Sequence, residues 1–431
     1  MANQQAIQDD NQSYALIAHS GTAGTAETVR VVADSAGNLG VNIVSGEIIA
    51  SLGTVDVLKA GSVVVTAGTI AALTNGSSYF KLSDENGTAY GVKHVSNKPR
   101  VSSMPYLYDI AEGNVSGHTA WSKVGYNSAI TTSEEDIWSA GGTYVFPTAA
   151  DGWDVVSSST KDAGTEIHSG SDATITATTI TKAGENFLTT TAVGDCVILD
   201  KSGTTPAWGY VTAVTSDTVL TIGGGWSTTP ASTAAYSVID QSVATNTGAQ
   251  AVKISYLDGN YAEKTEIVIL NGTTPVNTVN VDMYRCNSFR VIAAGSTYKA
   301  VGNLSLRLEG GAATVYSYIS AGYTRARNTI YTVPAGKTLY ITQWSVGAST
   351  PNDTKVQTCR VMTRANVEPS TGFKTDNIFY GYTEFLVSNG IENIEFTVPT
   401  KLNAKTDIKV SAVGLTGFSG PVTSVLRGWI E

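Results

Sequence analysis

The sequence predicts an all-β protein, and three observations carry that prediction. Only 15% of the 431 residues are charged, 43 are Gly, and Thr, Ser, Val and Ala fill most of the strand-like runs. Branched side chains pack well on a pleated surface and lose rotamer freedom in a helix, so this composition favours strands. Apolar and polar residues alternate in short runs, which are separated by turn-forming pairs such as Asn-Gly. No long amphipathic helical pattern accompanies them.

Residues 248–281 show these signals most clearly. Apolar and polar residues alternate over 252–256, the period of a strand with one buried face. The Asp-Gly-Asn run at 258–260 tolerates positive φ and lets the chain reverse. Residues 261–270 return as a second strand, and Asn-Gly then turns the chain again. The stretch therefore predicts a β-meander.

Charge and cysteine content exclude several classes of protein. The chain has 27 basic and 36 acidic residues, a formal net charge of −9, and no Lys/Arg cluster, so we expect no nucleic-acid binding. No apolar run is long enough for a membrane span, and residues 14–18 are too short for a signal-peptide core. Cys196, Cys286 and Cys359 are odd in number and far apart, which argues against a disulfide framework. We expect a soluble protein synthesised in a cytoplasm.

The N-terminal region, residues 1–45, is predicted to be an attachment arm followed by a hairpin. Residues 1–28 are polar and without period, so they are either a disordered terminus or an arm that orders on a partner. Residues 29–43 have the pattern of a hairpin, with the turn at 34–38.

Residues 46–99 are predicted to form an oligomeric β stem. Glycines at positions 46, 53, 61 and 68 separate three short strand-like runs, none of which can build a core alone. Such units become stable when neighbours or other copies of the chain cover them. The alternative is a flat edge hairpin of the next domain. A second hairpin follows with Asn86-Gly87 at its tip, and Lys98-Pro99 then favours an extended linker.

Residues 100–321 are predicted to form a β-sandwich domain that is interrupted by a small β-barrel at 164–247. The interrupting piece has closely spaced short strands, with turns at 194–195 and 216–217. Insertions are tolerated where the flanking chain ends lie close together.

Residues 322–431 are predicted to form a C-terminal β-sandwich or jelly-roll. Two halves of this region are related: 330–334 and 396–399 both end in Val-Pro and lead through a polar turn into an alternating strand. Residues 426–430 are expected to close a sheet.

Four histidines are candidates for a metal or catalytic site. They are spread over different units of the chain, at His19, His94, His118 and His168. None lies four residues from another and no Cys-x-x-Cys occurs, so zinc-ligand spacing is absent and a structural or exposed role is expected for each. There is no Gly-x-Ser-x-Gly or Walker motif. The glycines at 223–225 precede Trp226 in a turn context, so a phosphate cradle is not expected.

Two groups of acidic residues invite a chemical interpretation. The run Glu134-Glu135-Asp136 is the only tight carboxylate cluster in the sequence. A glycosidase needs two carboxyl groups about 5 to 9 Å apart across a cleft, whereas adjacent strand residues point to opposite faces. We expect a solvated loop there instead. Asp258 and Asn260 with Glu263 could offer oxygens to calcium, but they lack the spacing of a defined calcium loop, and a plain turn is expected.

The tryptophans are either sugar-stacking or core residues, and in β-proteins scattered tryptophans are more often core. They are Trp121, Trp138, Trp153, Trp208, Trp226, Trp344 and Trp429. No catalytic constellation emerges from any of these searches. We therefore predict no catalytic, cofactor-binding or metal-binding residues, no cofactor and no enzymatic activity.

Three runs of the chain resemble segments of tailed-bacteriophage virion proteins, namely those described as capsid fibres, head decorations or tail fibres. The runs are AWSKVGYNSAITTSEEDIWSAGGTYVFP, ISYLDGNYAEKTEIVILNGTTPV and IYTVPAGKTLYITQW. The likeness covers most of residues 115–160 and 248–345. The resemblance implies an N-terminal attachment part, a shaft and outward β-domains, often as a homotrimer.

The resemblance leads us to expect a structural virion protein, a capsid-bound fibre or decoration protein that is anchored to the major capsid protein or another virion protein by its N-terminal region. The alternative is a tail fibre or receptor-binding protein that contacts host surface glycan. Its location is accordingly the capsid surface or the tail of the virion. A third class is a polysaccharide depolymerase. Such an enzyme is expected to have a long regular β-helix and a pair of acidic side chains that face inward, and neither is visible in the sequence.

Overall fold

The computed structural model describes residues 106–431, except 312–313, 350–357, 376–377, 389 and 416, together with short strands between residues 16 and 100. The chain divides into two compact units, Met1–Val101 and Ser102–Glu431. In the described part, two short helices, α1 (Tyr106–Ala111) and α2 (Phe187–Thr190), accompany strands in seven sheets. The prediction of an all-β protein is confirmed.

The N-terminal unit contains two antiparallel three-stranded sheets. One has the order β1-β2-β3 and the other β4-β5-β6. Their strands are β1 (Leu16–Ala18), β2 (Val29–Ala33), β3 (Leu39–Val41), β4 (Tyr79–Ser83), β5 (Ala89–Val95) and β6 (Lys98–Arg100). Both predicted hairpins are confirmed, because β2 pairs with β3 and β4 pairs with β5. The expected linker at Lys98-Pro99 is extended and also pairs with β5. The predicted glycine-spaced stem at 46–73 lies outside the described residues.

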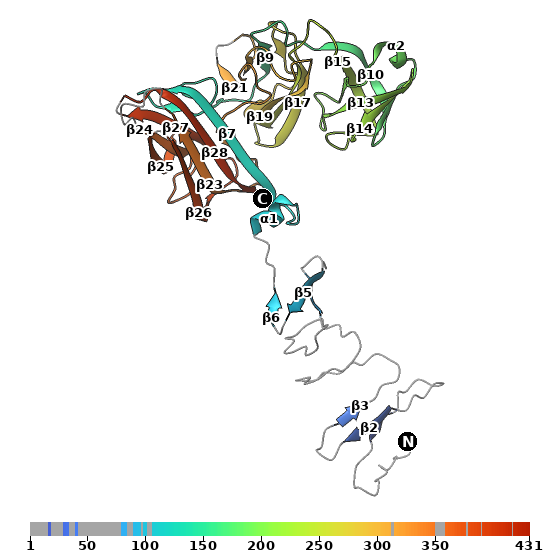
Figure 1. Cartoon of the computed structure of the whole chain (residues 1–431), viewed down its shortest axis with the longest axis vertical. Helices are drawn as coiled ribbons and strands as arrows, with labels where there is room; N and C mark the ends of the chain where they lie inside the picture. Colours follow the sequence, from blue (N-terminus) through green and yellow to red (C-terminus); the bar gives the residue numbers. More distant parts are fainter. Residues whose placement is uncertain are drawn as a thin grey trace. The chain divides into compact units, whose positions relative to one another are not determined.

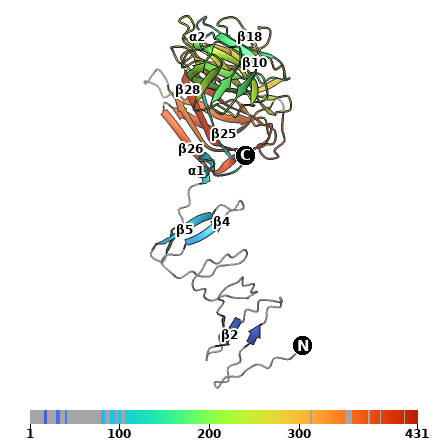
Figure 2. The same cartoon turned by 90° about the vertical axis from the view of Figure 1, so that its right-hand side faces the viewer.

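The large unit contains three β-modules. The first is the C-terminal sandwich, whose strands come from both the beginning and the end of the large unit's sequence. One sheet has the order β26-β23-β28-β7, and the other has the order β22-β27-β24-β25 with β8 added to β27. Its strands are β7 (Thr119–Ile130), β8 (Glu135–Asp136), β22 (Tyr331–Thr332), β23 (Leu339–Ala348), β24 (Thr358–Ala365), β25 (Tyr380–Ser388), β26 (Gly390–Leu402), β27 (Asp407–Leu415) and β28 (Gly420–Ile430). Figure 1 shows β7 beside β28, and Figure 2 shows β25 and β26 at one edge of this sandwich.

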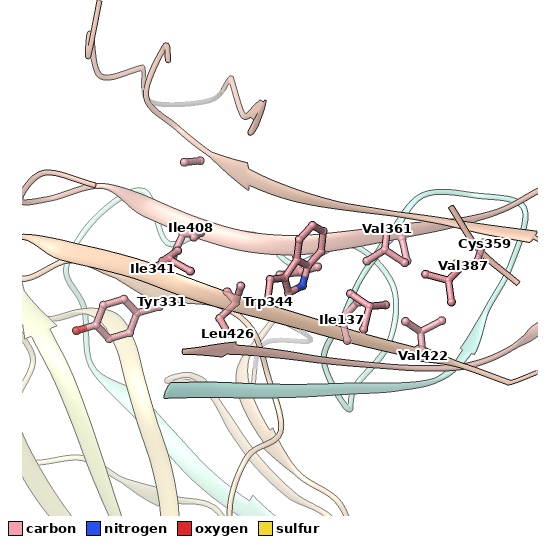
Figure 3. Close-up of a cluster of buried hydrophobic side chains, with 14 of the residues drawn as sticks. Ile137, Tyr331, Ile341, Trp344, Cys359, Val361, Val387, Ile408, Val422 and Leu426 are labelled. Carbon is pink, nitrogen blue, oxygen red and sulfur yellow. The ribbon is translucent and has the colours of Figure 1, made fainter. Parts of the chain in front are cut away.

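The core of the C-terminal sandwich is built from both sheets around Trp344. Ile341 and Leu426 come from the sheet that contains Trp344, and Val361 and Ile408 come from the facing sheet (Figure 3). All five side chains are buried. Alternating apolar residues on β23 and β28 supply this inner face, as the period-two pattern of the sequence predicts.

The predicted boundary between 100–321 and 322–431 is wrong for β7 and β8. β7 pairs along the whole of β28, with Trp121 opposite Gly428, and β8 pairs with β27. Both strands therefore belong to the C-terminal sandwich. The physical reason is that an antiparallel ladder can join residues about 300 positions apart, and the local alternation of a strand carries no information about its partner.

The middle sandwich contains the predicted meander. Its sheets have the orders β17-β16-β19 and β18-β9-β20-β21. The strands are β9 (Trp153–Ser157), β16 (Ala249–Asp258), β17 (Glu263–Ile269), β18 (Val276–Asn277), β19 (Met283–Ala294), β20 (Leu304–Leu308) and β21 (Val315–Ile319). The expected pairing of β16 with β17 is confirmed. β18 leaves the meander and pairs with β9 in the facing sheet.

The third module is a closed six-stranded barrel, so the predicted small β-barrel is confirmed. Its order is β10-β11-β14-β13-β12-β15. The strands are β10 (Thr165–Ile175), β11 (Thr179–Thr181), β12 (Cys196–Leu199), β13 (Ala207–Ser216), β14 (Val219–Gly223) and β15 (Thr233–Asp240). The barrel is inserted between β9 and β16 of the middle sandwich, which is itself inserted between β8 and β22 of the C-terminal sandwich. The large unit is therefore a nested series of insertions.

Asp162 holds the two chain ends together at the point where the barrel is inserted. Its carboxylate is fully buried and accepts hydrogen bonds from the N–H groups of Ala249 (2.8 Å), Val301 (2.8 Å) and Gly302 (2.7 Å) and from the hydroxyl of Ser157 (2.6 Å). Ala249 opens β16, where the chain returns from the barrel. The carboxylate thus joins the departing and returning segments and satisfies three backbone donors.

Candidate functional site

A groove of about 400 Å³ lies beside α1 on the outer face of the sheet that contains β7, β23 and β28. Leu107 and Ile110 of α1 line one side of it. The floor includes Trp429, whose ring stacks on Tyr340 with the centroids 5.1 Å apart, and Arg427, whose Nη1 donates to Oε1 of Gln343 at 2.8 Å. The groove therefore combines apolar and aromatic surface with an exposed cation.

The helix beside this groove presents apolar side chains to solvent. Ile110 is only 4% exposed and fixes α1 on the sheet, whereas Leu107 and Tyr108 are 49% and 51% exposed. On a helix, Tyr108 lies opposite Ile110 because residues two apart are separated by about 200°. The helix can therefore contact a second surface without leaving its own sheet. The sequence offered no signal for this site, because six residues are too few to establish a helical period.

The acidic run at 134–136 is not the solvated loop expected from the sequence. Asp136 is 1% exposed and lies 2.9 Å from the ammonium of Lys409. Its carboxylate also accepts from the hydroxyl of Ser411 (2.6 Å) and the N–H of Tyr144 (2.6 Å). A β-ladder between β8 and β27 brings these groups together, which the linear sequence could not reveal. Asp136 fastens β8 to the C-terminal sandwich.

The other two carboxylates of the run also have structural partners. Glu134 pairs with Arg364 at 2.8 Å. Partial burial acts to raise the pKa of Glu135, but hydrogen bonds from the N–H of Gly142 and from Thr131 and Asn127 outweigh it and lower the pKa. Each carboxylate thus has a different set of partners, which is not the arrangement of a general acid facing a general base.

The Asp258 turn is the plain turn expected from the sequence. Oδ1 of Asp258 accepts from the N–H groups of Asn260 (2.8 Å) and Ala262 (3.0 Å), and its Oδ2 lies 3.3 Å from the ammonium of Lys264. Burial acts to raise the pKa of Asp258, but these hydrogen bonds and Lys264 lower it. An ammonium group occupies the side of the carboxylate that a calcium ion would need. In the described part of the chain, no group of His, Cys, Asp or Glu side chains could hold a metal ion.

His168 belongs to a partly buried polar network in the barrel, in keeping with the structural role expected for it. Its Nδ1 lies 2.6 Å from Oε2 of Glu185 and its Nε2 lies 2.5 Å from the hydroxyl of Thr190. The hydroxyl of Tyr236 donates to Glu185, and the imidazole contacts the ring of Phe187 edge-on. Of the other histidines, His118 lies 2.9 Å from Glu431, while His19 and the side chain of His94 lie outside the described residues.

Replacing Glu185 with Gln is expected to destabilise the barrel at pH 7 and to have little effect in acid. Partial burial acts to raise the pKa of Glu185, but hydrogen bonds from Tyr236 and His168 outweigh it and hold the pKa below 4.5. A folded-state pKa below the unfolded value contributes stability above pH 4.5, and that stability is lost as the pH falls through the folded value. Hydrogen exchange of the β10 and β15 amides at pH 7 and below pH 4 measures the effect. Glu166→Gln is the control, because Glu166 meets Lys201 only at 3.8 Å. A difference that persists in acid would contradict the assignment.

The three cysteines and the tryptophans Trp138, Trp153 and Trp344 are buried structural residues. Cys196, Cys286 and Cys359 are buried and free, and burial raises their pKa values to about 12, 11 and 11. A thiol with a raised pKa is a poor nucleophile at neutral pH. Trp153 and Trp344 are buried in the cores of the middle and C-terminal sandwiches, as their expected core role requires, and Trp138 is buried with Tyr144 and Ile330 in a separate small cluster. Among the described helices, none is long and apolar enough to cross a membrane.

Comparisons with known proteins add little to this description. No family model matches the chain, and no curated protein matches it. One solved structure, that of the infectious bursal disease virus Gt strain, is 9% identical and covers 76% of each chain with a TM-score of 0.11. A likeness this weak carries no argument about fold or function.

Proposed function

We propose that this chain is a non-enzymatic structural protein of a tailed-phage virion, a capsid-bound fibre or decoration protein that is held by its N-terminal region. The observation that carries the proposal is the division of the chain into a small-sheet unit, Met1–Val101, and a large unit of three nested β-modules, Ser102–Glu431. This division corresponds to an attachment part followed by outward domains, as the resemblance to virion proteins implies.

The N-terminal sheets support a role that depends on partners. β1 and β3 have three residues each, and β2 has five. A sheet of three such short strands is marginally stable by itself. Contact with sister copies or with a capsid shell would add the surface that it lacks. Binding to the folded form then stabilises it by mass action.

The carboxylates of the large unit support a structural role over a depolymerase. Glu134 forms an ion pair with Arg364, Asp136 with Lys409, and Asp258 with Lys264. Glu135 accepts a hydrogen bond from its own loop. The sequence offered Glu134, Glu135 and Asp136 for acid–base chemistry and Asp258 for calcium binding. Their observed partners hold strands and turns together.

A homotrimer is part of the proposal, and the groove beside α1 supports it. α1 is the first described element of the large unit, and copies of the chain are proposed to meet at this helix. The exposed Leu107 and Tyr108 provide apolar surface for that contact.

Deletion of residues 1–45 is expected to abolish attachment to the particle while the β-domains stay folded, because attachment is assigned to the deleted region. Purified particles that lack the protein are mixed with the full chain or with the truncated chain, and bound protein is measured after sedimentation. Circular dichroism of the truncated chain checks that the strands remain. Decoration of particles by the truncated chain would overturn the proposal.

A tail fibre that contacts host glycan is the second candidate function. The groove favours it, because Trp121, Trp429 and the exposed Arg427 line it and such groups suit sugar recognition. Gold-labelled antibody on intact particles distinguishes the two, because label on the head supports the first candidate and label on the tail supports the second.

A further inference from the structure

Three basic residues that are distant in the sequence lie in one row across the middle sandwich. Lys253 of β16 is directly opposite Arg290 of β19 in the antiparallel ladder, and Arg290 forms an antiparallel bridge with Arg325. Directly opposed residues in antiparallel pairs point to the same face of a sheet. The three cationic side chains therefore share one face.

The positive charges of this row are not compensated. In the part of the chain that the structure describes, none of the three forms an ion pair with Asp or Glu, although the whole chain has a net charge of −9. Arg290 and Arg325 are exposed and Lys253 is half-buried. Burial, and secondly the charge of Arg290, lower the pKa of Lys253. An anion beside these groups would relieve their mutual repulsion.

The inserted barrel completes the surface with Trp208. Nζ of Lys253 lies 5.1 Å and Cζ of Arg290 lies 5.2 Å from the centre of the Trp208 ring. The hydroxyl of Tyr210, two residues later on β13, donates to the carbonyl of Ile292 and fastens this barrel wall to β19. Cation–π contacts orient the two side chains but add no negative charge, because the ring is neutral. Both cations thus stay available to an anionic ligand.

A pair of hydroxyl groups lies beside the cationic row. Ser255 and Ser288 are directly opposite each other in the same ladder, two residues from Lys253 and Arg290. Residues two apart on a strand share a face, so the serines continue the row. The surface therefore offers ammonium and guanidinium groups for an acid and hydroxyls for neighbouring sugar hydroxyl groups.

We infer that this face, formed by Lys253, Arg290, Arg325, Ser255, Ser288 and Trp208, is a binding site for an acidic polysaccharide. The guanidinium groups of Arg290 and Arg325 match carboxylate or sulfate in a two-bonded geometry. A long duplex nucleic acid is a poorer fit, because three cations neutralise few phosphates and a chain of net charge −9 repels a dense polyanion. The inference does not depend on the proposed anchoring of the N-terminal region.

The test measures binding of the full chain to three immobilised polymers by biolayer interferometry. Polygalacturonate carries carboxylates, heparin carries sulfates as well, and dextran is neutral. We expect binding to at least one acidic polymer and none to dextran, with affinity falling as salt rises. The double variant Arg290→Ala/Arg325→Ala is expected to bind at least tenfold more weakly. Lys401→Ala is the control, since this exposed lysine is on β26 of the other sandwich.

Several results would overturn the inference. These are absence of binding to both acidic polymers, equal binding to dextran, and unchanged affinity of the double variant. A change in sedimentation coefficient of the double variant with unchanged polymer binding would show that the cations face a second copy of the chain instead. Thermal unfolding of each variant checks that the fold is intact. Attachment to particles is measured in a separate experiment. Failure of the attachment proposal and failure of the polysaccharide-binding inference can therefore be told apart.

Discussion

Replacement of Asp407 with Ala is expected to lower the free energy of unfolding by about 3 to 5 kcal/mol, the usual cost of leaving one member of a buried ion pair alone. Asp407 is 1% exposed and receives Nε and a terminal nitrogen of Arg285, each at 3.0 Å. The hydroxyl of Thr332 (2.6 Å) and the amide of Asn366 (3.1 Å) also donate to it. The pair joins β19 of the middle sandwich to β27 of the C-terminal sandwich. Its loss leaves a guanidinium buried between the two modules.

The free energy of unfolding is measured by urea titration, with near-ultraviolet circular dichroism as the signal. The double variant Arg285→Met/Asp407→Leu is the matched control, because it removes both charges and keeps apolar volume at the interface. It is expected to lose less stability than Asp407→Ala alone, since no charge remains buried without a partner. Equal losses in the two variants would show that the packing of this interface, rather than the ion pair, carries the stability.

Replacement of Trp344 with Ala is expected to cost about 3 to 5 kcal/mol, the range for truncating a large buried aromatic side chain. Trp344 is fully buried at the centre of the C-terminal sandwich (Figure 3). Its ring centre lies 4.3 Å from that of Phe385 on the facing sheet, and its Nε1 donates to the hydroxyl of Ser424 at 2.8 Å. The variant loses these contacts and leaves a cavity between the sheets.

Ser424→Ala separates the hydrogen bond of Trp344 from its packing. This control keeps the indole in place and is expected to cost about 1 to 3 kcal/mol, the penalty for an unsatisfied buried donor. Thermal unfolding monitored by tryptophan fluorescence compares the two variants. If Trp344→Ala were no more destabilising than Ser424→Ala, the packing around the ring would contribute little and the prediction would be wrong.

Local signals in the sequence predicted local structure well. The alternation over 252–256 corresponds to β16, with Val252, Ile254 and Tyr256 buried. The turn at 258–260 reverses the chain into β17. The interrupted pattern around 164–247 correctly predicted the closed barrel. In the hairpin of β16 and β17 the alternating pattern and its turn lie within a few residues of each other, whereas closure of the barrel also pairs β10 with β15, which lie far apart in the sequence.

Distant pairing could not be predicted in the same way. Trp121 lies in a strand whose alternation is clear, yet its partner Gly428 is near the end of the chain. Because strand pairing between distant segments cannot be read from local patterns, the sequence did not predict that Asp136 is buried beside Lys409. It also did not predict that Lys253 and Arg290 lie in one row. Those two cations are 37 positions apart in the sequence, so no basic cluster was visible. Sites assembled across ladders require the register, which the sequence pattern does not contain.

The nested arrangement has a consequence for synthesis of the chain. β7 leaves the ribosome first among the strands of the C-terminal sandwich, but β28, its ladder partner, is made about 300 residues later. At roughly 5 to 20 residues per second the nascent β7 waits about 15 to 60 s for that partner. The barrel and the middle sandwich can fold during this interval, from the inside outward. The C-terminal sandwich, whose strands come from both ends of the large unit's sequence, is therefore completed last, after the two modules inserted in its sequence have folded.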